Sequence, residues 1–323
     1  MEAVDVRIEV ADAVTRPSRL LVLKHAQSPL GVDAQVVDRM ELLPVQLPVP
    51  GSHLLIKSNG LVAAASVLFL GVPRLAQLDY KGIRDFGRRA LSVAAKVAPD
   101  APEVCITLHG PGFGLDESES FESEVAGLVD AVSAHEVSPG LRVVTFLEID
   151  RRRAAWMDST LEALLPGRRI DRGKPLSSGA IGAREAQRLR SVGYDSDEKS
   201  HAFVAMPFAE AFDDVFHYGI QPSIHDAGYL CVRIDQVAFT GDIVDTLRRR
   251  ISSAKFLVAD VTGANPNVYL EIGFAWGCDV PTVLVCRDTA DLMFDIRGQR
   301  CVSYSSIRDL EAKLGREISA LFL

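Results

Sequence analysis

The chain has 323 residues, more than one hydrophobic core normally serves, so its length predicts two domains. Hydrophobic residues make up 48% and charged residues 24%, which excludes wholesale disorder, collagen-like repeats and a coiled coil. The formal net charge of −8 argues against a protein built mainly to bind nucleic acid or an anionic membrane.

The five cysteines are odd in number, form no Cys-x-x-Cys motif and mostly lie in apolar runs, as expected for reduced thiols. Glu2 and Asp5 stand where a signal peptide needs basic residues, and the longest apolar run, residues 61–72, is too short to span a bilayer. The sequence therefore predicts a cytoplasmic protein without a membrane partner.

The first half of the chain alternates strand-like and helical patterns. Strands are predicted at residues 6–10, 19–24, 67–70, 104–108 and 141–147, and helices at 85–97 and 117–135. This alternation predicts an α/β domain over residues 1–165.

A glycine-rich loop follows the strand at 104–108 and leads into an acidic helix. Its glycines, Gly110, Gly112 and Gly114, would let backbone N–H groups approach a phosphate at the helix N-terminus. The acids Asp116 and Glu117 would repel that phosphate, although they also complement the helix dipole. A ligand loop and a purely structural turn are both open interpretations.

The loop and its flanks, about residues 20–150, weakly resemble macro-like domains and the related N-terminal domain of leucine aminopeptidases. Macro-like domains bind ADP-ribose-type ligands. The resemblance therefore implies that the first domain senses a nucleotide fragment.

Residues 166–200 are rich in Gly, Pro, Ser and charge, which predicts a linker between the domains. The segment is locally basic through Arg168, Arg169, Arg172, Lys174, Arg184, Arg188 and Arg190. A solvated linker explains these charges, and an anionic ligand or RNA is the alternative.

From His201 the alternation is cleaner. Strands are predicted at 203–208, 229–234, 256–261, 282–286 and 301–304, and helices at 212–227, 242–253 and 266–278 and at the C-terminus. Short apolar strands between helices predict a parallel, doubly wound sheet over residues 201–323, with ligands bound beyond the strands' carboxyl ends. The residues leaving those ends are the candidates for ligand contact: Met206, Pro207, Phe208, Asp235, Asp260, Arg287 and Asp288. Further candidate substrate contacts are Arg233, Gly241, Asp242, Asn265 and Asn267.

The helix at 266–278 carries the strongest chemical signal. Asn265 suits the N-cap position and Pro266 the first helical position. Glu271 is the only charge between Val268 and Cys278, and it shares a helix face with Asn267. A carboxylate is costly to bury in so apolar a helix unless it forms hydrogen bonds or has a function, so Glu271 is a candidate catalytic residue.

Two effects act on the ionisation of Glu271: the helix dipole favours the charged form and apolar surroundings oppose it. An ionised, poorly solvated carboxylate suits a glycosyl-transfer nucleophile or oxocarbenium stabiliser. Asp260, at the same sheet edge, is the candidate second carboxyl. Alternatively, Asp260 caps the following turn and Glu271 hydrogen-bonds backbone.

Several motifs in the second half occur in an order that resembles the nucleoside 2-deoxyribosyltransferase-like family. They are Phe203-Val-Ala-Met-Pro-Phe208, Gly228 with Arg233-Ile-Asp235, Gly241-Asp242-Ile243, Ala259-Asp-Val-Thr-Gly263, Asn265-Pro-Asn267-Val-Tyr269, Glu271-Ile-Gly-Phe-Ala275, and Phe294-Asp-Ile296 with Tyr304. The resemblance covers about residues 201–304 and implies a flavodoxin-like fold shared with TIR-like domains.

In the transferases a Glu in a Glu-x-Gly-x-Ala context is the nucleophile at C1′ of the sugar, and the resemblance places that role on Glu271. The authentic Pro-Asp-x-Gly-Thr-Ala segment is replaced by Pro266-Asn-Val-Tyr-Leu270, which is more similar to the TIR-like branch of bacterial defence and signalling proteins. That branch implies cleavage of the N-glycosidic bond of NAD or another nucleotide, as substrate rather than cofactor. It also implies self-association.

Three functions remain open: a glycosidase that uses Glu271, a non-catalytic nucleotide-binding sensor or interaction module, and a two-domain effector that senses with one domain and cleaves with the other. No metal is expected, because His217 and His225, eight residues apart, lack a partner at metal-binding spacing.

Overall fold

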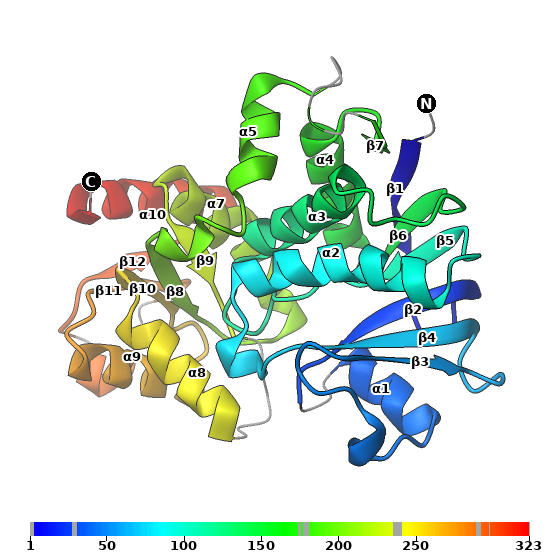
Figure 1. Cartoon of the computed structure of the whole chain (residues 1–323). Coiled ribbons are helices and arrows are strands. Elements are labelled where there is room, and N and C mark those ends of the chain that lie inside the picture. The colour runs from blue at the N-terminus through cyan, green and yellow to red at the C-terminus, as the bar shows by residue number, and fades with distance from the viewer. Residues whose placement is uncertain are drawn as a thin grey trace. The chain divides into compact units, whose positions relative to one another are not determined.

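The computed structural model describes residues 3–27, 31–173, 176, 181–234, 241–288, 292–296 and 298–322. Their contacts divide the chain into two units: residues 1–110 with 118–197, and residues 111–117 with 198–323. Each unit is built on one sheet flanked by helices, so the predicted α/β class is confirmed (Figure 1). No helix within the described ranges is long and apolar enough to cross a membrane.

The first unit contains a seven-stranded sheet of order β3-β4-β2-β5-β6-β1-β7, parallel except for its two edge strands, β3 and β7. The strands are β1 (Ala3–Val10), β2 (Ser18–His25), β3 (His53–Lys57), β4 (Ala64–Gly71), β5 (Glu103–Ile106), β6 (Val143–Glu148) and β7 (Arg169–Asp171). The helices are α1 (Val32–Arg39), α2 (Tyr80–Val97), α3 (Glu117–Ser133), α4 (Arg151–Leu164) and α5 (Ala183–Ser191), with short 3₁₀ turns at Pro44–Gln46, Leu75–Gln77 and Ser196–Glu198.

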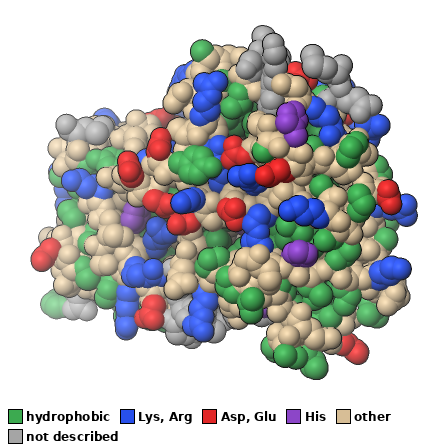
Figure 2. Space-filling view, in the orientation of Figure 1, with side chains coloured by type: hydrophobic (Ala, Val, Ile, Leu, Met, Phe, Trp, Pro, Cys, Tyr) green, Lys and Arg blue, Asp and Glu red, His purple; other side chains and the backbone are tan. Residues whose placement is uncertain are grey.

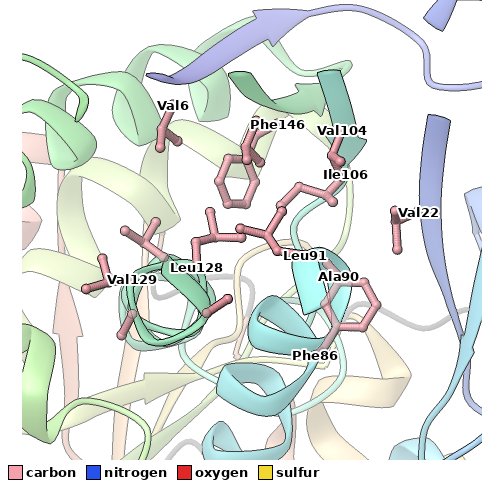
Figure 3. Packing of buried hydrophobic residues seen from close by; sticks show 14 of the residues in the cluster. Val6, Val22, Phe86, Ala90, Leu91, Val104, Ile106, Leu128, Val129 and Phe146 are labelled. Carbon is pink, nitrogen blue, oxygen red and sulfur yellow. The ribbon is translucent and has the colours of Figure 1, made fainter. Parts of the chain in front are cut away.

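Both faces of this sheet are covered. Side chains alternate along β2, so Leu20 and Val22 join the cluster under α2 and α3, whereas Leu21 and Leu23 pack on the α1 side. Figure 3 shows the first of these clusters, with residues of α2 and α3 facing residues of the strands. A strand buried on both faces reads as a continuous apolar run, which is why β2 was predictable.

Helices α2 and α3 approach each other closely at two glycines. A Cβ added to Gly87 would lie 2.3 Å from the carbonyl oxygen of Glu124, and one added to Gly127 would lie 2.0 Å from that of Arg84. Any larger side chain would push the helices apart, so these glycines fix the close packing of the layer.

The segment expected to be a linker, residues 166–200, is folded instead. Up to Asp197 it belongs to the first unit, with β7 paired to β1 and α5 in contact with α4. Its arginines form ion pairs with carboxylates: Arg168 with Asp158 and Glu162, Arg169 with Asp5, and Arg188 with Glu119 and Glu122. The partners of Arg169 and Arg188 are distant in sequence, so composition alone does not reveal them. Lys174 lies outside the described residues.

Acidic and basic side chains are interspersed on the face of the molecule drawn in Figure 2. That face therefore presents no extended field of a single sign, in keeping with the pairing of the arginines above.

The second unit contains a five-stranded, fully parallel sheet of order β12-β11-β10-β8-β9. The strands are β8 (His201–Ala205), β9 (Leu230–Val232), β10 (Phe256–Asp260), β11 (Thr282–Cys286) and β12 (Cys301–Ser303). Numbered within the unit, the order is 2-1-3-4-5, that of a flavodoxin-like sheet. The strand order reverses between β8 and β10, which places the ligand crevice of such a sheet beyond the carboxyl ends of those two strands.

Helices cover both faces of the second sheet. Helices α8 (Gly241–Ser252) and α9 (Pro266–Gly277) pack on one face, and a helical segment with α10 (Ile307–Phe322) packs on the other. A short 3₁₀ turn, η7, spans Phe294–Ile296.

The helix predicted at 212–227 is that helical segment, and it is not uniform. It runs as η4 (Glu210–Phe212), α6 (Asp213–Val215), a π-helix η5 (Phe216–Ile220) and α7 (Gln221–Asp226). Pro222 has no N–H to donate to the preceding turn, which is consistent with the change of helix type.

Candidate functional site

The chain leaves β8 and β10 at the switch point of the second sheet. After β8, Met206 and Pro207 are buried and Phe208 is 38% exposed. At the end of β10, Asp260 is fully buried. Both strand ends thus contribute residues predicted as substrate contacts to one edge of the sheet.

Both carboxylate oxygens of Asp260 are engaged. Oδ1 accepts a hydrogen bond from the backbone N–H of Thr262 (3.0 Å), and Oδ2 accepts one from the hydroxyl of Tyr304 (2.7 Å). The pKa of Tyr304 is raised, first by burial and then by the adjacent Asp260 carboxylate. Asp260 therefore fastens the turn after β10 to the residue after β12.

The Tyr304→Phe substitution tests this link. It would leave Asp260 Oδ2 buried without its donor, so the free energy of unfolding should fall by about 1–3 kcal/mol. The half-exposed Tyr218 offers a matched control, since Tyr218→Phe should change stability by less than about 0.5 kcal/mol in the same urea titration. Equal losses of unfolding free energy in both variants would show that the Asp260–Tyr304 hydrogen bond does not stabilise the fold.

Helix α9, which follows β10, carries Glu271. Asn265 caps the helix as predicted, with its side-chain oxygen accepting from the N–H of Asn267 (2.9 Å). Asn267 is exposed, whereas Glu271, one turn later, is only 8% exposed. The two residues therefore differ in their access to solvent.

Burial raises the pKa of Glu271 from its ordinary 4.5 to about 8. Of the two opposing effects on this carboxyl, desolvation therefore outweighs the helix dipole. A pKa of about 8 leaves the group roughly nine-tenths protonated at pH 7. The sequence left the balance of these two effects open; in the structure the carboxyl is mostly neutral without a ligand.

Two arginines lie at the same edge. Arg233, after β9, has its guanidinium carbon 4.0 Å from the centre of the Phe216 ring and its Nη1 3.7 Å from Met206 Sδ. Arg287, after β11, lies 5.7 Å from the Phe212 ring centre and 6.0 Å from that of Tyr304. The backbone N–H of Arg287 also donates to Thr262 Oγ1 (3.0 Å), which ties it to the turn held by Asp260.

The side chains of three predicted substrate contacts are not described in the structure. Asp235 lies outside the described residues, and Gly241 and Asp242 are described only as the first residues of α8. Their roles stay predictions.

The glycine-rich loop belongs by its contacts to the second unit from Pro111 onward. Gly110, Gly112 and Gly114 have φ angles of 109°, 77° and 84°, which favour glycine. A Cβ on Gly114 would lie 3.1 Å from the Arg250 side chain, and the neighbouring Phe113 forms an antiparallel bridge with Ile234. Packing accounts for Gly114, and a ligand role for the loop stays a prediction.

The acids after this loop have partners within the second unit. Asp116 Oδ2 accepts hydrogen bonds from His225 Nε2 (2.6 Å) and from the backbone N–H of Cys231 (2.8 Å). His217 Nδ1 lies 3.8 Å from a carboxylate oxygen of Glu117. The two histidines of the helical segment thus anchor the loop instead of acting as a pair.

The sequence placed Arg287 at the ligand edge of the sheet and Tyr304 at the end of a predicted strand, and it gave no role to Thr262, Phe212 or Phe216. A signal was available for the phenylalanines, because two aromatic residues four apart in a helix share one face. The contacts of Arg287 and Thr262 depend on the order of the strands, which the sequence does not state.

No protein-family model and no curated protein matches this chain. Solved structures with partial likeness include a macrodomain mutant from Oceanobacillus iheyensis, with 15% identity, a TM-score of 0.39, and 50% of this chain and 88% of that chain covered. The macrodomain of Mycobacterium tuberculosis DarG has 15% identity and a TM-score of 0.34, with 44% and 97% covered. The bottromycin maturation enzyme BotP has 12% identity and a TM-score of 0.31, with 93% and 89% covered.

Both macrodomains match the N-terminal half, where the loop resembles macro-like domains. At these identities and TM-scores the likenesses establish neither a shared fold nor a shared ligand. The resemblance of residues 201–304 to nucleoside 2-deoxyribosyltransferase-like and TIR-like proteins stays a prediction.

Proposed function

We propose that the second unit binds NAD or a related nucleotide or nucleoside at the carboxyl edge of its sheet and cleaves the N-glycosidic bond, with Glu271 as the reacting carboxyl. The observation that carries this proposal is the pKa of about 8 of Glu271, a buried acid in a helix that follows a switch-point strand. A carboxyl with a pKa near the working pH is typical of a catalytic group. The first unit, on this proposal, senses a ligand.

Hydrolysis of NAD at this site balances without a further co-reactant besides water. The C1′–N bond breaks, its electron pair goes to the pyridinium nitrogen, and neutral nicotinamide leaves an oxocarbenium ion at C1′. Ionised Glu271 stabilises or bonds to that cation, and water then attacks C1′ to give ADP-ribose and a proton. The positive charge of the pyridinium favours the ionised carboxyl, which offsets part of the rise in pKa caused by burial.

A purine nucleotide would use the other protonation state. Its base leaves as an anion unless it is protonated, and the neutral form of Glu271 can donate that proton. The same residue would then act as a general acid, and its pKa of about 8 would suit that role at pH 7.

The pH dependence distinguishes these two roles. If ionised Glu271 reacts, kcat/KM for NAD should rise about tenfold for each unit below pH 8 and level off above it, because the ionised fraction rises in that way. If neutral Glu271 is the acid, kcat/KM should fall above pH 8. Nicotinamide or free base, separated by chromatography after incubation at pH 6–9.5, gives the profile, and a profile flat through pH 8 would exclude both roles.

The activity itself is tested by incubating the full chain with NAD, nucleoside monophosphates and nucleosides. The expected result is release of free base from at least one of them by the wild-type chain and release slowed by on the order of 10³-fold in Glu271→Gln. Release at the wild-type rate in Glu271→Gln would remove Glu271 from the reaction.

A non-catalytic nucleotide-binding sensor is the second candidate. The hydrogen bonds of Asp260 favour this candidate. Both of its oxygens accept hydrogen bonds from Thr262 and Tyr304, so Asp260 has a structural role and is not available as a second carboxyl for proton transfer. Calorimetry with NAD and ADP-ribose would then show binding without turnover. Slow base release that Glu271→Gln abolishes would exclude this candidate.

A further inference from the structure

Two of the five cysteines meet on neighbouring strands of the second sheet. Cys286 is the last residue of β11 and Cys301 is the first of β12, and their sulfur atoms lie 3.2 Å apart. Both thiols are reduced in the structure. The proposed cleavage uses neither of them, so that reaction does not explain their contact.

The register of the strands explains why the two side chains touch. In the parallel pair of β11 and β12, Leu284 lies opposite Cys301 and Cys286 lies opposite Ser303. Residues two apart in a strand point to the same face, so Cys286 and Leu284 share a face with Cys301. Both thiols therefore pack beneath α8 and α9, with Cys286 inside that hydrophobic cluster and Cys301 against it.

A disulfide between these residues requires only a small movement. An S–S bond is about 2.05 Å long, so the two sulfurs must approach each other by on the order of 1 Å. The cysteines are diagonal and not directly opposite neighbours, so the backbone of β12 has to move with them. This strand is three residues long, lies at the edge of the sheet and, among the described strands, pairs with β11 alone, so it can shift without disturbing a second ladder.

The two thiols differ in exposure. Cys286 is buried, whereas Cys301 is half-buried on the edge strand, so a small oxidant meets Cys301 first. Burial, the neighbouring Cys286 and the Asp260 carboxylate raise the pKa of the Cys301 thiol, which keeps its thiolate scarce at neutral pH. Oxidation is therefore slow and requires sustained exposure to the oxidant, unlike the fast reaction of a sensor cysteine.

We propose that Cys286 and Cys301 form a modification site, at which a hydroperoxide converts the two thiols into a reversible disulfide between β11 and β12. The Cys301 thiolate attacks one peroxide oxygen, the O–O bond breaks, and the products are a sulfenic acid and water or an alcohol. Cys286 then attacks the sulfur of the sulfenic acid: the S–S bond forms, the S–O bond breaks, and the departing hydroxide takes the thiol proton to become water. The two thiols lose two electrons in total, and the peroxide gains them.

The disulfide would lie beside the edge at which the second unit is proposed to bind its ligand. The carbonyl oxygen of Cys286 accepts a hydrogen bond from the backbone N–H of Tyr304 (2.9 Å), and the hydroxyl of Tyr304 donates to Asp260. Oxidation would thus act on the strand that leads to Tyr304. The modification itself does not depend on the proposed cleavage, since it needs only the two cysteines and the oxidant.

Mass spectrometry of the full chain after treatment with hydrogen peroxide tests the proposal. Trypsin releases Cys301 in peptide 301–308 and Cys286 in peptide 256–287, which also contains Cys278. In a Cys278→Ser chain, a link between these two peptides can come only from Cys286. The expected product is a linked peptide about 2 Da lighter than the two peptides together, and dithiothreitol should restore both thiols.

The Cys278→Ser chain that also carries Cys301→Ser is the matched control. It should give no linked peptide, and Cys286 should still react with N-ethylmaleimide after unfolding in urea. The same peroxide treatment of the urea-unfolded Cys278→Ser chain should spread the links to Cys105 and Cys231, because the strands no longer hold the pair together. Circular dichroism shows whether each variant is folded, and fragmentation of the peptide between residues 278 and 286 gives the same assignment in the wild-type chain.

Three results would overturn the proposal. Both thiols could still react with maleimide after the peroxide treatment, Cys301 could go on to sulfinic acid without forming the link, or the link could join two chains and give a dimer on a non-reducing gel. Each of these would show that the contact between Cys286 and Cys301 is only a packing contact.

Discussion

Replacing Glu271 with Gln should reduce base release by on the order of 10³-fold while leaving the fold and the affinity for nucleotide in place. The amide has nearly the same shape as the carboxyl, so the packing of α9 against the sheet is kept. It can neither carry the negative charge that stabilises the oxocarbenium ion nor donate an acidic proton. Both proposed roles of Glu271 are therefore lost together.

The measurement is kcat and KM for the best substrate found, with the affinity for that substrate from calorimetry. A loss confined to kcat with unchanged binding supports a role at the reacting atoms. The exposed Glu311 on α10 provides the matched control, because Glu311→Gln removes a carboxylate that the proposed reaction does not use and should keep wild-type kcat. A Glu271→Gln chain with full kcat would end the catalytic assignment.

The same Glu271→Gln substitution should make the protein more stable at neutral pH, by an amount that grows with pH. In the unfolded chain Glu271 ionises near 4.5, but in the folded chain it ionises near 8. The contribution of its neutral form to stability is therefore fully present below about pH 4.5 and is lost as the pH rises to about 8. Gln has no such dependence, because it does not titrate.

The advantage of Glu271→Gln over wild type should therefore increase by about 1.4 kcal/mol for each pH unit between about 5 and 8, on the order of 4 kcal/mol in total. Urea unfolding of both chains at several pH values measures this difference, and Glu311→Gln again serves as control. A constant difference across that range would show that Glu271 is not buried as an acid. A residue that lowers stability at neutral pH and is required for activity is typical of a functional site.

Most strands and helices could be predicted from the sequence because local patterns determine them, but β3, β7, α1, α4 and α5 were missed. The strands from β8 to β12 are short apolar runs between helical stretches, and Asn265 with Pro266 marks the start of α9. Glu271 was predictable for the same reason, as a lone charge in an apolar helix.

Features that depend on partners distant in sequence were not predictable. The Gly, Pro, Ser and charge content of 166–200 predicted a linker, but carboxylates such as Glu119 and Glu122 form ion pairs with Arg188 and the segment up to Asp197 is folded. Likewise, Asp116 was expected either to repel a phosphate or to complement the helix dipole, whereas its carboxylate accepts hydrogen bonds from His225 and from the backbone N–H of Cys231. Composition shows the charge of a segment but not which oppositely charged residues pair with it in the fold.

The protonation state of Glu271 also required the structure. The sequence gives two opposing effects, the helix dipole and apolar surroundings, without their magnitudes. The dipole acts mainly within the first turn, and Glu271 lies beyond it in a buried position, so desolvation prevails.

The most direct test of the account compares the ionisation of Glu271 with the pH dependence of catalysis in the same buffers. The carboxyl is followed by carbon-13 NMR of labelled glutamate, and its signal is assigned as the one missing from Glu271→Gln. The account predicts that this carboxyl titrates near pH 8 and that kcat/KM changes with the same midpoint. A carboxyl that titrates near 4.5, or a midpoint near 8 that persists in Glu271→Gln, would contradict it.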